Sequence, residues 1–196
     1  MTLVAASQIR DVAIVVFEGV ELLDFTGPYE TFHAARGFFR VSTVAHDTEL
    51  LSSDAGLEIK PTYSFANCPA PDIVVIPGGH VHAAIEDSSA MDFIRSSLKS
   101  AEIVMSVCNG AMVLAELDVL DGLTVTTHQG TISSLKQRAP KATVVDDRKW
   151  VDNGRIITAA GVSSGIDATL HVIGRLHGDD VAREVAQYLE FSQRAE

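Results

Sequence analysis

Short runs of β-branched residues alternate along the chain with stretches of helical periodicity, and this alternation restricts the fold more than any other feature. The runs are too short and too β-branched to be helices. We expect strands at 12–17, 73–76, 103–107, 124–127 and 155–158, and helices at 28–35, 90–98, 111–117, 131–137, 165–176 and 180–191. Strands separated by helices form βαβ units with parallel strands. The sequence therefore predicts an α/β fold, a doubly wound, mostly parallel sheet with helices on both faces.

Two polar, turn-rich segments interrupt this pattern. They are LLSSDAGLEIKPTYSF, residues 50–65, and VVDDRKWVDNGRI, residues 144–156. Each contains a turn, at 54–56 and at 152–154, whose glycine can adopt a positive φ, so both segments are predicted to be hairpins. The 196 residues contain no internal repeat, low-complexity stretch or linker, and 46% are apolar, which is ample for one core. We expect a single domain over 1–196 with its core at about 11–191.

The charge balance excludes some classes of partner. There are 15 basic and 26 acidic residues, a formal net charge of −11, which repels phosphate backbones and anionic lipid. We therefore expect no nucleic-acid and no membrane partner. The start of the chain, MTLVAASQIR, lacks the basic and apolar parts of a secretory signal, and no apolar run approaches the roughly 18 residues that span a bilayer. We expect a cytoplasmic protein.

The cysteine and histidine content does not indicate a metal centre. Cys68 and Cys108 cannot form a disulfide framework, and in a reducing compartment they are expected to be free thiols. His80 and His82 have strand-like spacing, but no third ligand accompanies them. We expect no metal and no cofactor.

Cys108 directly follows the strand predicted at 103–107 and precedes a segment of good helix-forming residues. A strand that ends in x-Cys-x-Gly directly before a helix resembles a nucleophile elbow, whose sharp turn raises the reactive side chain above the carboxyl edge of the sheet. Gly110 would let the backbone pass closely. We expect a strained or positive φ at Cys108, and a thiol pKa depressed by the N–H groups at the helix start. The alternative is a small buried hydrophobe at a strand end.

Two further features follow predicted strands. Gly78-Gly79 comes directly after residues 73–76, so the N–H groups of Gly79 and Asn109 can form an oxyanion hole for a thiolate adduct, although most Gly-Gly pairs are only tight turns. Asp24 lies in an apolar stretch, LLDF, just before TGP opens or kinks a helix. A carboxylate in apolar surroundings should have a raised pKa, which suits general acid–base chemistry near neutral pH. The alternative is a capping or turn aspartate.

Taken together, these motifs resemble the ThiJ/PfpI family of the class I glutamine amidotransferase-like superfamily, over about residues 11–191. Within that family the chain is most similar to isocyanide hydratases and to the ligand-sensing domains of certain AraC-type regulators, through LLDFTGP, IPGG, SVCNGA, LDGLTVTTH and GVSSGID. The resemblance implies a flavodoxin-like sandwich, a homodimer, Cys108 as the nucleophile and Asp24 hydrogen-bonded to its sulfur. It also implies that the N–H groups of Gly79 and Asn109 bind the adduct. Asn109 departs from the pattern, because those two branches usually carry Thr there and the proteolytic members carry His.

Three functions are compatible with these residues. As an isocyanide hydratase-like enzyme, the protein would form a Cys108 thioimidate and release an N-substituted formamide. As a glyoxalase III or deglycase-like enzyme it would act on 2-oxoaldehydes, and as a sensor it would bind a metabolite or oxidise at Cys108. His128 ends the strand predicted at 124–127, on the same edge as Cys108, and is either a pocket residue or a structural histidine. Trp150, in the second hairpin, is an exposed aromatic that a homodimer interface could use.

Overall fold

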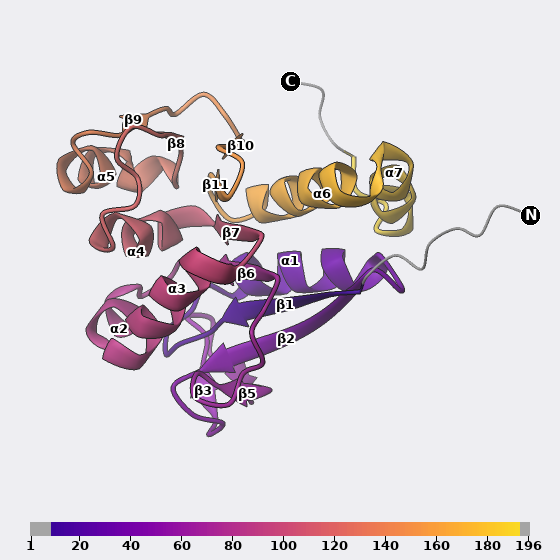
Figure 1. Ribbon diagram of the computed structural model, residues 1–196, viewed down its shortest axis with the longest axis horizontal. Coiled ribbons are helices and arrows are strands. Elements are labelled where there is room, and N and C mark those ends of the chain that lie inside the picture. The colour runs from indigo at the N-terminus through magenta and orange to yellow at the C-terminus, as the bar shows by residue number, and fades with distance from the viewer. Residues whose placement is uncertain (1–8, 193–196) are drawn as a thin grey trace, which may run out of the picture.

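The computed structural model describes residues 9–192, and its centre is a seven-stranded sheet in the order β10-β11-β7-β6-β1-β2-β5 (Figure 1). All neighbouring strands in this sheet are parallel except β10 and β11. Its strands are β1 (Arg10–Val15), β2 (Phe39–Ala45), β5 (Tyr63–Ser64), β6 (Ile73–Ile76), β7 (Ile103–Ser106), β10 (Trp150–Asp152) and β11 (Ile156–Ala159). Two short pairs lie outside it, the antiparallel β3 (Leu51–Ser52) with β4 (Glu58–Ile59) and the parallel β8 (Thr124–Val125) with β9 (Thr143–Val144).

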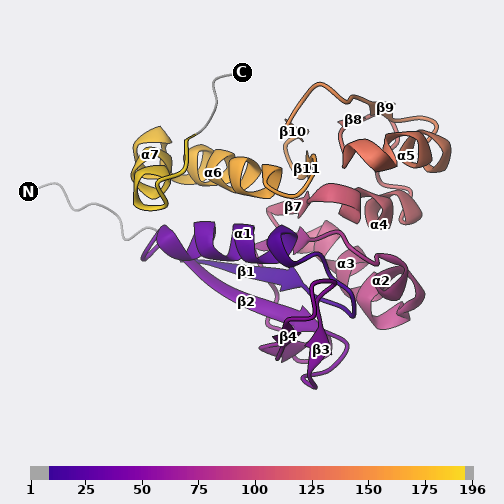
Figure 2. The ribbon, with the colours of Figure 1, turned by 180° about the vertical axis from the view of Figure 1, so that it is seen from behind.

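Helices cover both faces of the sheet. They are α1 (Leu22–Ala34), α2 (His82–Glu86), α3 (Ser88–Ser100), α4 (Ala111–Glu116), α5 (Ile132–Arg138), α6 (Ser164–His177) and α7 (Asp179–Tyr188). The views from the front and from behind place α1 and α6 on one face and α2 and α3 on the other (Figures 1 and 2). With helices on both sides, every residue of β6 and β7 is buried, which explains why these strands are consecutive apolar residues, apart from Ser106 at the end of β7, rather than alternating ones.

The predicted α/β architecture is confirmed, and most differences are at element ends. The strand predicted at 73–76 coincides with β6, and both hairpin turns form, with positive φ at Gly56 and Gly154. The prediction for 124–127 as a strand of the main sheet is wrong, because only β8 forms there and it pairs with β9. Thr126 and Thr127 use their polar groups elsewhere: Thr158 Oγ1 accepts a hydrogen bond from Thr126 N–H, and Thr127 Oγ1 donates one to Cys108 O.

Several elements are not predicted from the sequence, among them β2, α2 and the short strand β9. The long strand β2 was missed because its polar residues break the apolar pattern; Arg40, for example, pairs with the Asp11 carboxylate on β1. The short helix α2 was missed as well. Helix α1 was predicted to start at Pro28 but starts at Leu22, which places Asp24 inside its first turn. Trp150 was expected to be an exposed aromatic, but it is half-buried and its ring stacks on that of His171, with 3.8 Å between ring centroids.

No helix among residues 9–192 is both long enough and apolar enough to cross a bilayer. The N-terminal stretch in which we expect no secretory signal lies almost entirely outside the described residues.

Candidate active site

The turn after β7 holds Cys108 in the conformation expected for a nucleophile elbow. Cys108 has a φ of 57°, and a short 3-10 turn, Cys108–Gly110, leads directly into α4. The left-handed conformation costs a residue with a side chain about 1 kcal/mol or more. Two backbone hydrogen bonds and one from a side chain secure it: Cys108 N–H donates to Ala160 O at 2.9 Å, Gly110 N–H to Val107 O at 2.9 Å, and the Thr127 hydroxyl Oγ1 to Cys108 O at 2.7 Å. The predicted positive φ is confirmed.

Two glycines are needed for the close packing around this turn. A Cβ added at Gly110 would collide with the carbonyl oxygen of Ile76, the last residue of β6. A Cβ at Gly78 would collide with the side chains of Asn109 and Asp24. The elbow and the Pro77-Gly78-Gly79 turn therefore lie in direct contact, at the carboxyl ends of neighbouring strands.

Asp24 is the buried acid of the site, with none of its surface exposed. Gly78 N–H donates to Asp24 Oδ2 at 2.9 Å, whereas Oδ1 has no hydrogen-bond partner within the described residues. Burial raises the pKa of Asp24 to about 7, and the Gly78 hydrogen bond opposes that rise. The predicted raised pKa is confirmed, and at neutral pH Asp24 can both accept and donate a proton.

Cys108 and Asp24 perturb each other. Burial, followed by the charge of Asp24, raises the pKa of the Cys108 thiol to about 12. The expectation of a depressed thiol pKa is therefore wrong. It relied on the helix start, but α4 has only six residues and the thiol is 8% exposed beside a carboxyl group. Between the pKa of Asp24 and that of Cys108 the pair shares one proton, so a thiolate forms when the sulfur proton moves to Asp24.

The Cys108 sulfur also accepts two backbone hydrogen bonds. They lower the pKa of the thiol, but by less than burial raises it. One comes from Asn109 N–H, which the sequence analysis expects to bind the adduct, and the other from Val162 N–H. Val162 was missed by sequence reasoning. It has a φ of 38°, unusual for a β-branched residue, and the only signal was its place in the loop after a predicted strand.

Asn109 fixes the Gly78-Gly79 turn through its side chain. Gly79 N–H donates to Asn109 Oδ1 at 2.8 Å, and Asn109 Nδ2 donates to Gly79 O at 2.9 Å. The Gly79 N–H that was expected to face an adduct is thus occupied by Asn109 in this structure. A ligand can receive that hydrogen bond only if the Asn109 side chain moves.

His128 lies at the margin of the site. Its ring packs against Gly161, and its Nδ1 accepts a hydrogen bond from Gly130 N–H at 3.1 Å. Among the described residues, it makes no hydrogen bond to Cys108 or Asp24. Its effect on the site is electrostatic and passes through Glu21, whose charge raises the pKa of Asp24. Burial and a hydrogen bond with Asp54 raise the pKa of Glu21, and the charge of His128 opposes this rise.

The other cysteine is placed differently. Cys68 is half-buried, donates from Sγ to Pro69 O, and has a pKa raised by burial to about 11. Within residues 9–192, no three His, Cys, Asp or Glu side chains gather in a way that could hold a metal ion.

Known proteins resemble this chain in both sequence and fold. The model of the DJ-1/PfpI family matches residues 10–175. Isonitrile hydratase of Pseudomonas putida is 36% identical over 182 residues, which cover 92% of this chain and 78% of that protein. The HTH-type transcriptional regulator GbdR of Pseudomonas aeruginosa is 25% identical over 154 residues, and the match covers 79% of this chain but only 42% of the regulator.

Solved structures show the same architecture. A ThiJ/PfpI family protein from Pseudomonas syringae superimposes with a TM-score of 0.88 at 27% identity, covering all of this chain and 80% of that one. DJ-1beta of Drosophila melanogaster superimposes with a TM-score of 0.85 at 23% identity, covering 95% of this chain and all of that one, which supports the flavodoxin-like fold alone. Because the family match spans the elbow, the buried aspartate and the sheet that carries both, this chain belongs to the DJ-1/PfpI family.

Proposed function

We propose that the protein is a cysteine-dependent enzyme that hydrates small, uncharged isocyanides to N-substituted formamides. The observation that carries this proposal is the pairing of the Cys108 thiol with a buried Asp24 whose pKa is about 7. Hydration needs a nucleophile and a group that both takes and gives protons near neutral pH. The 36% identity to an isonitrile hydratase supports the choice of substrate.

The first step joins sulfur to carbon. The Cys108 thiol gives its proton to Asp24, the sulfur bonds to the terminal carbon of the isocyanide, and Asp24 passes a proton to that same carbon. The product is a thioimidate, whose carbon carries sulfur, hydrogen and a double bond to nitrogen. Asn109 N–H and Val162 N–H, which hydrogen-bond the sulfur, stabilise the charge that develops on it during proton transfer.

The second step releases the product. Water adds to the thioimidate carbon, and one of its protons goes to the nitrogen. The other proton reaches the departing sulfur through Asp24 as the carbon–sulfur bond breaks. One isocyanide and one water thus give one N-substituted formamide, and Cys108 and Asp24 regain their starting forms. Gly79 N–H would bind the developing oxygen charge after Asn109 turns away, and His128 would border the substrate.

A direct assay tests this proposal. Purified protein is incubated with cyclohexyl isocyanide, and the formamide is measured by liquid chromatography with mass spectrometry. Cys108→Ala should abolish turnover, and Asp24→Asn should lower it by at least ~100-fold, as expected for loss of a general acid–base. Cys68→Ala removes the other thiol and should keep full activity. Equal turnover by wild type and Cys108→Ala would refute the proposal.

A sensor role is the second candidate, and the buried Asp24 beside Cys108, whose pKa is raised to about 7, is the observation that favours it. A protonated Asp24 would donate a hydrogen bond to a Cys108 sulfinate formed by peroxide. Turnover separates the two functions. If neither the isocyanide nor methylglyoxal, the 2-oxoaldehyde tested as a glyoxalase substrate, is consumed while peroxide converts Cys108 to a stable sulfinate, the sensor role replaces the enzyme.

A further inference from the structure

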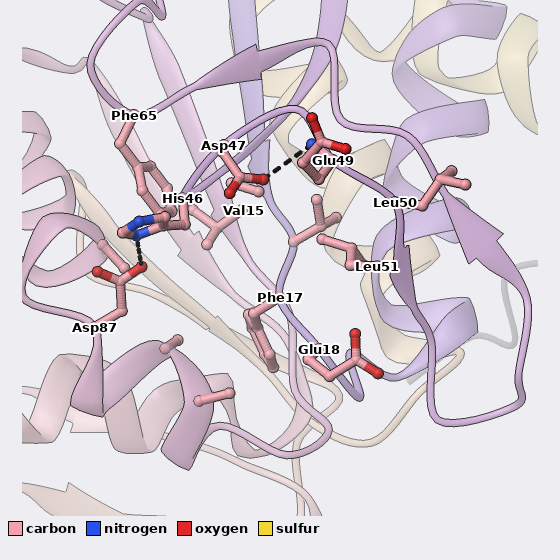
Figure 3. Close-up of a pocket in the computed structure, with 15 residues that line it drawn as sticks. Val15, Phe17, Glu18, His46, Asp47, Glu49, Leu50, Leu51, Phe65 and Asp87 are labelled. Atoms are coloured by element: carbon pink, nitrogen blue, oxygen red, sulfur yellow. Dashed lines mark hydrogen bonds and ion pairs between the residues drawn. The ribbon is translucent and has the colours of Figure 1, made fainter.

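A cavity lies apart from the Cys108 site, at the carboxyl ends of β1 and β2. Its volume is about 220 Å³, and neither Cys108 nor Asp24 lines it. Figure 3 shows Val15 and Phe17 at its centre, with charged side chains arranged around them. Ligands of open α/β sheets bind outside the carboxyl ends of strands, so the position is one where a small molecule is expected.

The floor of the cavity is apolar and its far wall is made of small residues. Val15 and Phe17 are buried, Phe65 and Leu51 are half-buried, and short alanine side chains of α2 and α3 leave the space open. A dry apolar cavity of about 150 Å³ can hold benzene. The present volume therefore has room for a ring or short alkyl body together with a small polar group.

The rim of the cavity is acidic, which favours a ligand of positive charge. Four carboxylates line the cavity, those of Glu18, Asp47, Glu49 and Asp87, whereas no Lys or Arg does so. Asp87 is the one with a nearby base, because its Oδ2 lies 3.0 Å from His46 Nδ1.

The other three carboxylates lack a cationic neighbour in the cavity lining. Glu18 Oε2 accepts Ser52 N–H at 2.9 Å and Asp47 Oδ1 accepts Glu49 N–H at 2.9 Å, which are bonds to neutral backbone groups. Each carboxylate repels an anion and attracts a cation by roughly 1–4 kcal/mol at contact distance near a protein surface. The charge of the rim thus complements a positively charged head group.

We propose that this cavity is a binding site for a small amphipathic amine, with its apolar body on the Val15–Phe17 floor and its ammonium group among the rim carboxylates. An ammonium group offers three donors, and the carboxylate oxygens of Asp47 and Glu49, which Figure 3 shows beside each other on the rim, can accept from it. The site is separate from the Cys108 chemistry and does not depend on the proposed hydration reaction.

The test uses 2-phenylethylamine as the probe and isothermal titration calorimetry at pH 7. We expect saturable 1:1 binding with a Kd of about 1 mM or tighter, the range that ligand efficiencies allow for so small a molecule. 2-Phenylethanol, which is neutral, should bind more weakly, and anionic 3-phenylpropionate at least ~10-fold more weakly than the amine. The Cys108→Ala variant should bind the amine as wild type does. Absence of saturable amine binding, or equal affinity for the anion, would overturn the proposal.

Variants locate the site. Asp47→Asn/Glu49→Gln, on the exposed rim, should weaken amine binding at least ~5-fold, because two attractive charges are lost. Glu30→Gln/Glu184→Gln removes the same net charge from exposed positions that do not line the cavity, and should bind normally. Ala83→Leu narrows the cavity and should abolish binding, with Ala186→Leu on α7 as the matched control for stability. If Asp47→Asn/Glu49→Gln and Glu30→Gln/Glu184→Gln bind the amine with equal affinity, the amine does not bind in this cavity.

Discussion

The side-chain amide of Asn109 holds the backbone of Gly79 through both of its polar groups, with hydrogen bonds of 2.8 and 2.9 Å. The residue after the nucleophile thereby fixes the turn whose other glycine, Gly78, donates to Asp24. Because the Gly78 hydrogen bond lowers the pKa of Asp24 against the effect of burial, Asn109 influences the acid of the site through the backbone of the Gly78-Gly79 turn.

The first prediction follows from this connection. Asn109→Ala should loosen the Gly78-Gly79 turn, weaken the Gly78 hydrogen bond and raise the pKa of Asp24 above about 7. The pH profile of kcat/KM should then shift to higher pH, and stability should fall by about 1–3 kcal/mol as two partly buried hydrogen bonds are lost. Asn153→Ala loses a comparable side-chain bond, to Thr124 O, away from the site. An unshifted profile in Asn109→Ala, or the same shift in both variants, would contradict this prediction.

The elbow itself was predictable from sequence, whereas the contacts of Asn109 were not. The order strand, cysteine, glycine, helix restricts the backbone at Cys108 strongly enough to predict a positive φ. The Asn109 side chain, in contrast, depends on the distance between two turns that follow different strands. No local pattern encodes that distance, so the N–H of Gly79 was expected to be free.

The second prediction concerns the stability of the protein as a function of pH. The pKa of Asp24 rises from an ordinary value of 3.8 to about 7 in the folded state. The folded protein therefore binds this proton more tightly, and its free energy of unfolding should fall as pH rises from about 4 to 7. At 1.36 kcal/mol per pKa unit, the loss from this one group is roughly 4 kcal/mol.

Asp24→Asn isolates that contribution, since asparagine has no proton to lose. Urea denaturation at intervals between pH 4 and 8 should show the wild type losing stability relative to the variant across this window. Above pH 7 the variant should be the more stable protein. A difference between the two that does not change with pH would show that Asp24 ionises normally.

The third prediction concerns the reactivity of Cys108 with iodoacetamide. The negative charge of Asp24 contributes to the raised pKa of the thiol, so Asp24→Asn should increase the labelling rate of Cys108 by about 10-fold at pH 8, equivalent to one pKa unit. Near pH 6, where Asp24 is protonated in the wild type, the two rates should converge. Peptide mass mapping measures both thiols.

Cys68 is the internal control in that experiment, because its raised pKa comes from burial and the charge of Asp11 rather than from Asp24. Its labelling rate should be the same in both proteins at every pH. Unchanged Cys108 labelling in Asp24→Asn would mean that the carboxylate does not govern the thiol.

Composition and periodicity predicted the layers of the fold but not the whole sheet. The strands β6 and β7 are buried on both sides, and each begins with at least three consecutive apolar residues, a pattern that is easily recognised in the sequence. The strand β2 is half-buried along much of its length and carries Arg40, whose partner Asp11 lies on β1. The ion pair offsets the cost of placing a charged residue in the strand, but it joins residues far apart in the sequence and is visible only in the folded structure. For the same reason the sequence does not show that the Trp150 ring is stacked, because its partner His171 comes 21 positions later.

The last prediction is that the protein is a homodimer, with an interface other than the Trp150 hairpin. Large exposed apolar side chains at the start of α1 and on the β3–β4 hairpin include Leu23, 39% exposed, and Leu57, 51% exposed. The two segments are joined, since Leu22 N–H donates to Asp54 Oδ1 and Asp54 N–H to Val20 O. Exposed apolar side chains on two joined segments favour association between copies of a chain.

Light scattering over a wide concentration range should therefore give twice the mass of one chain. Leu23→Lys/Leu57→Lys should convert the dimer to a monomer, because charges would be buried without partners at the interface. Tyr188→Lys provides the control, as Tyr188 is 59% exposed on α7, away from that surface, and should leave the dimer intact. A wild-type protein that is monomeric throughout, or a double lysine variant that still dimerises, would show that these leucines do not form the interface.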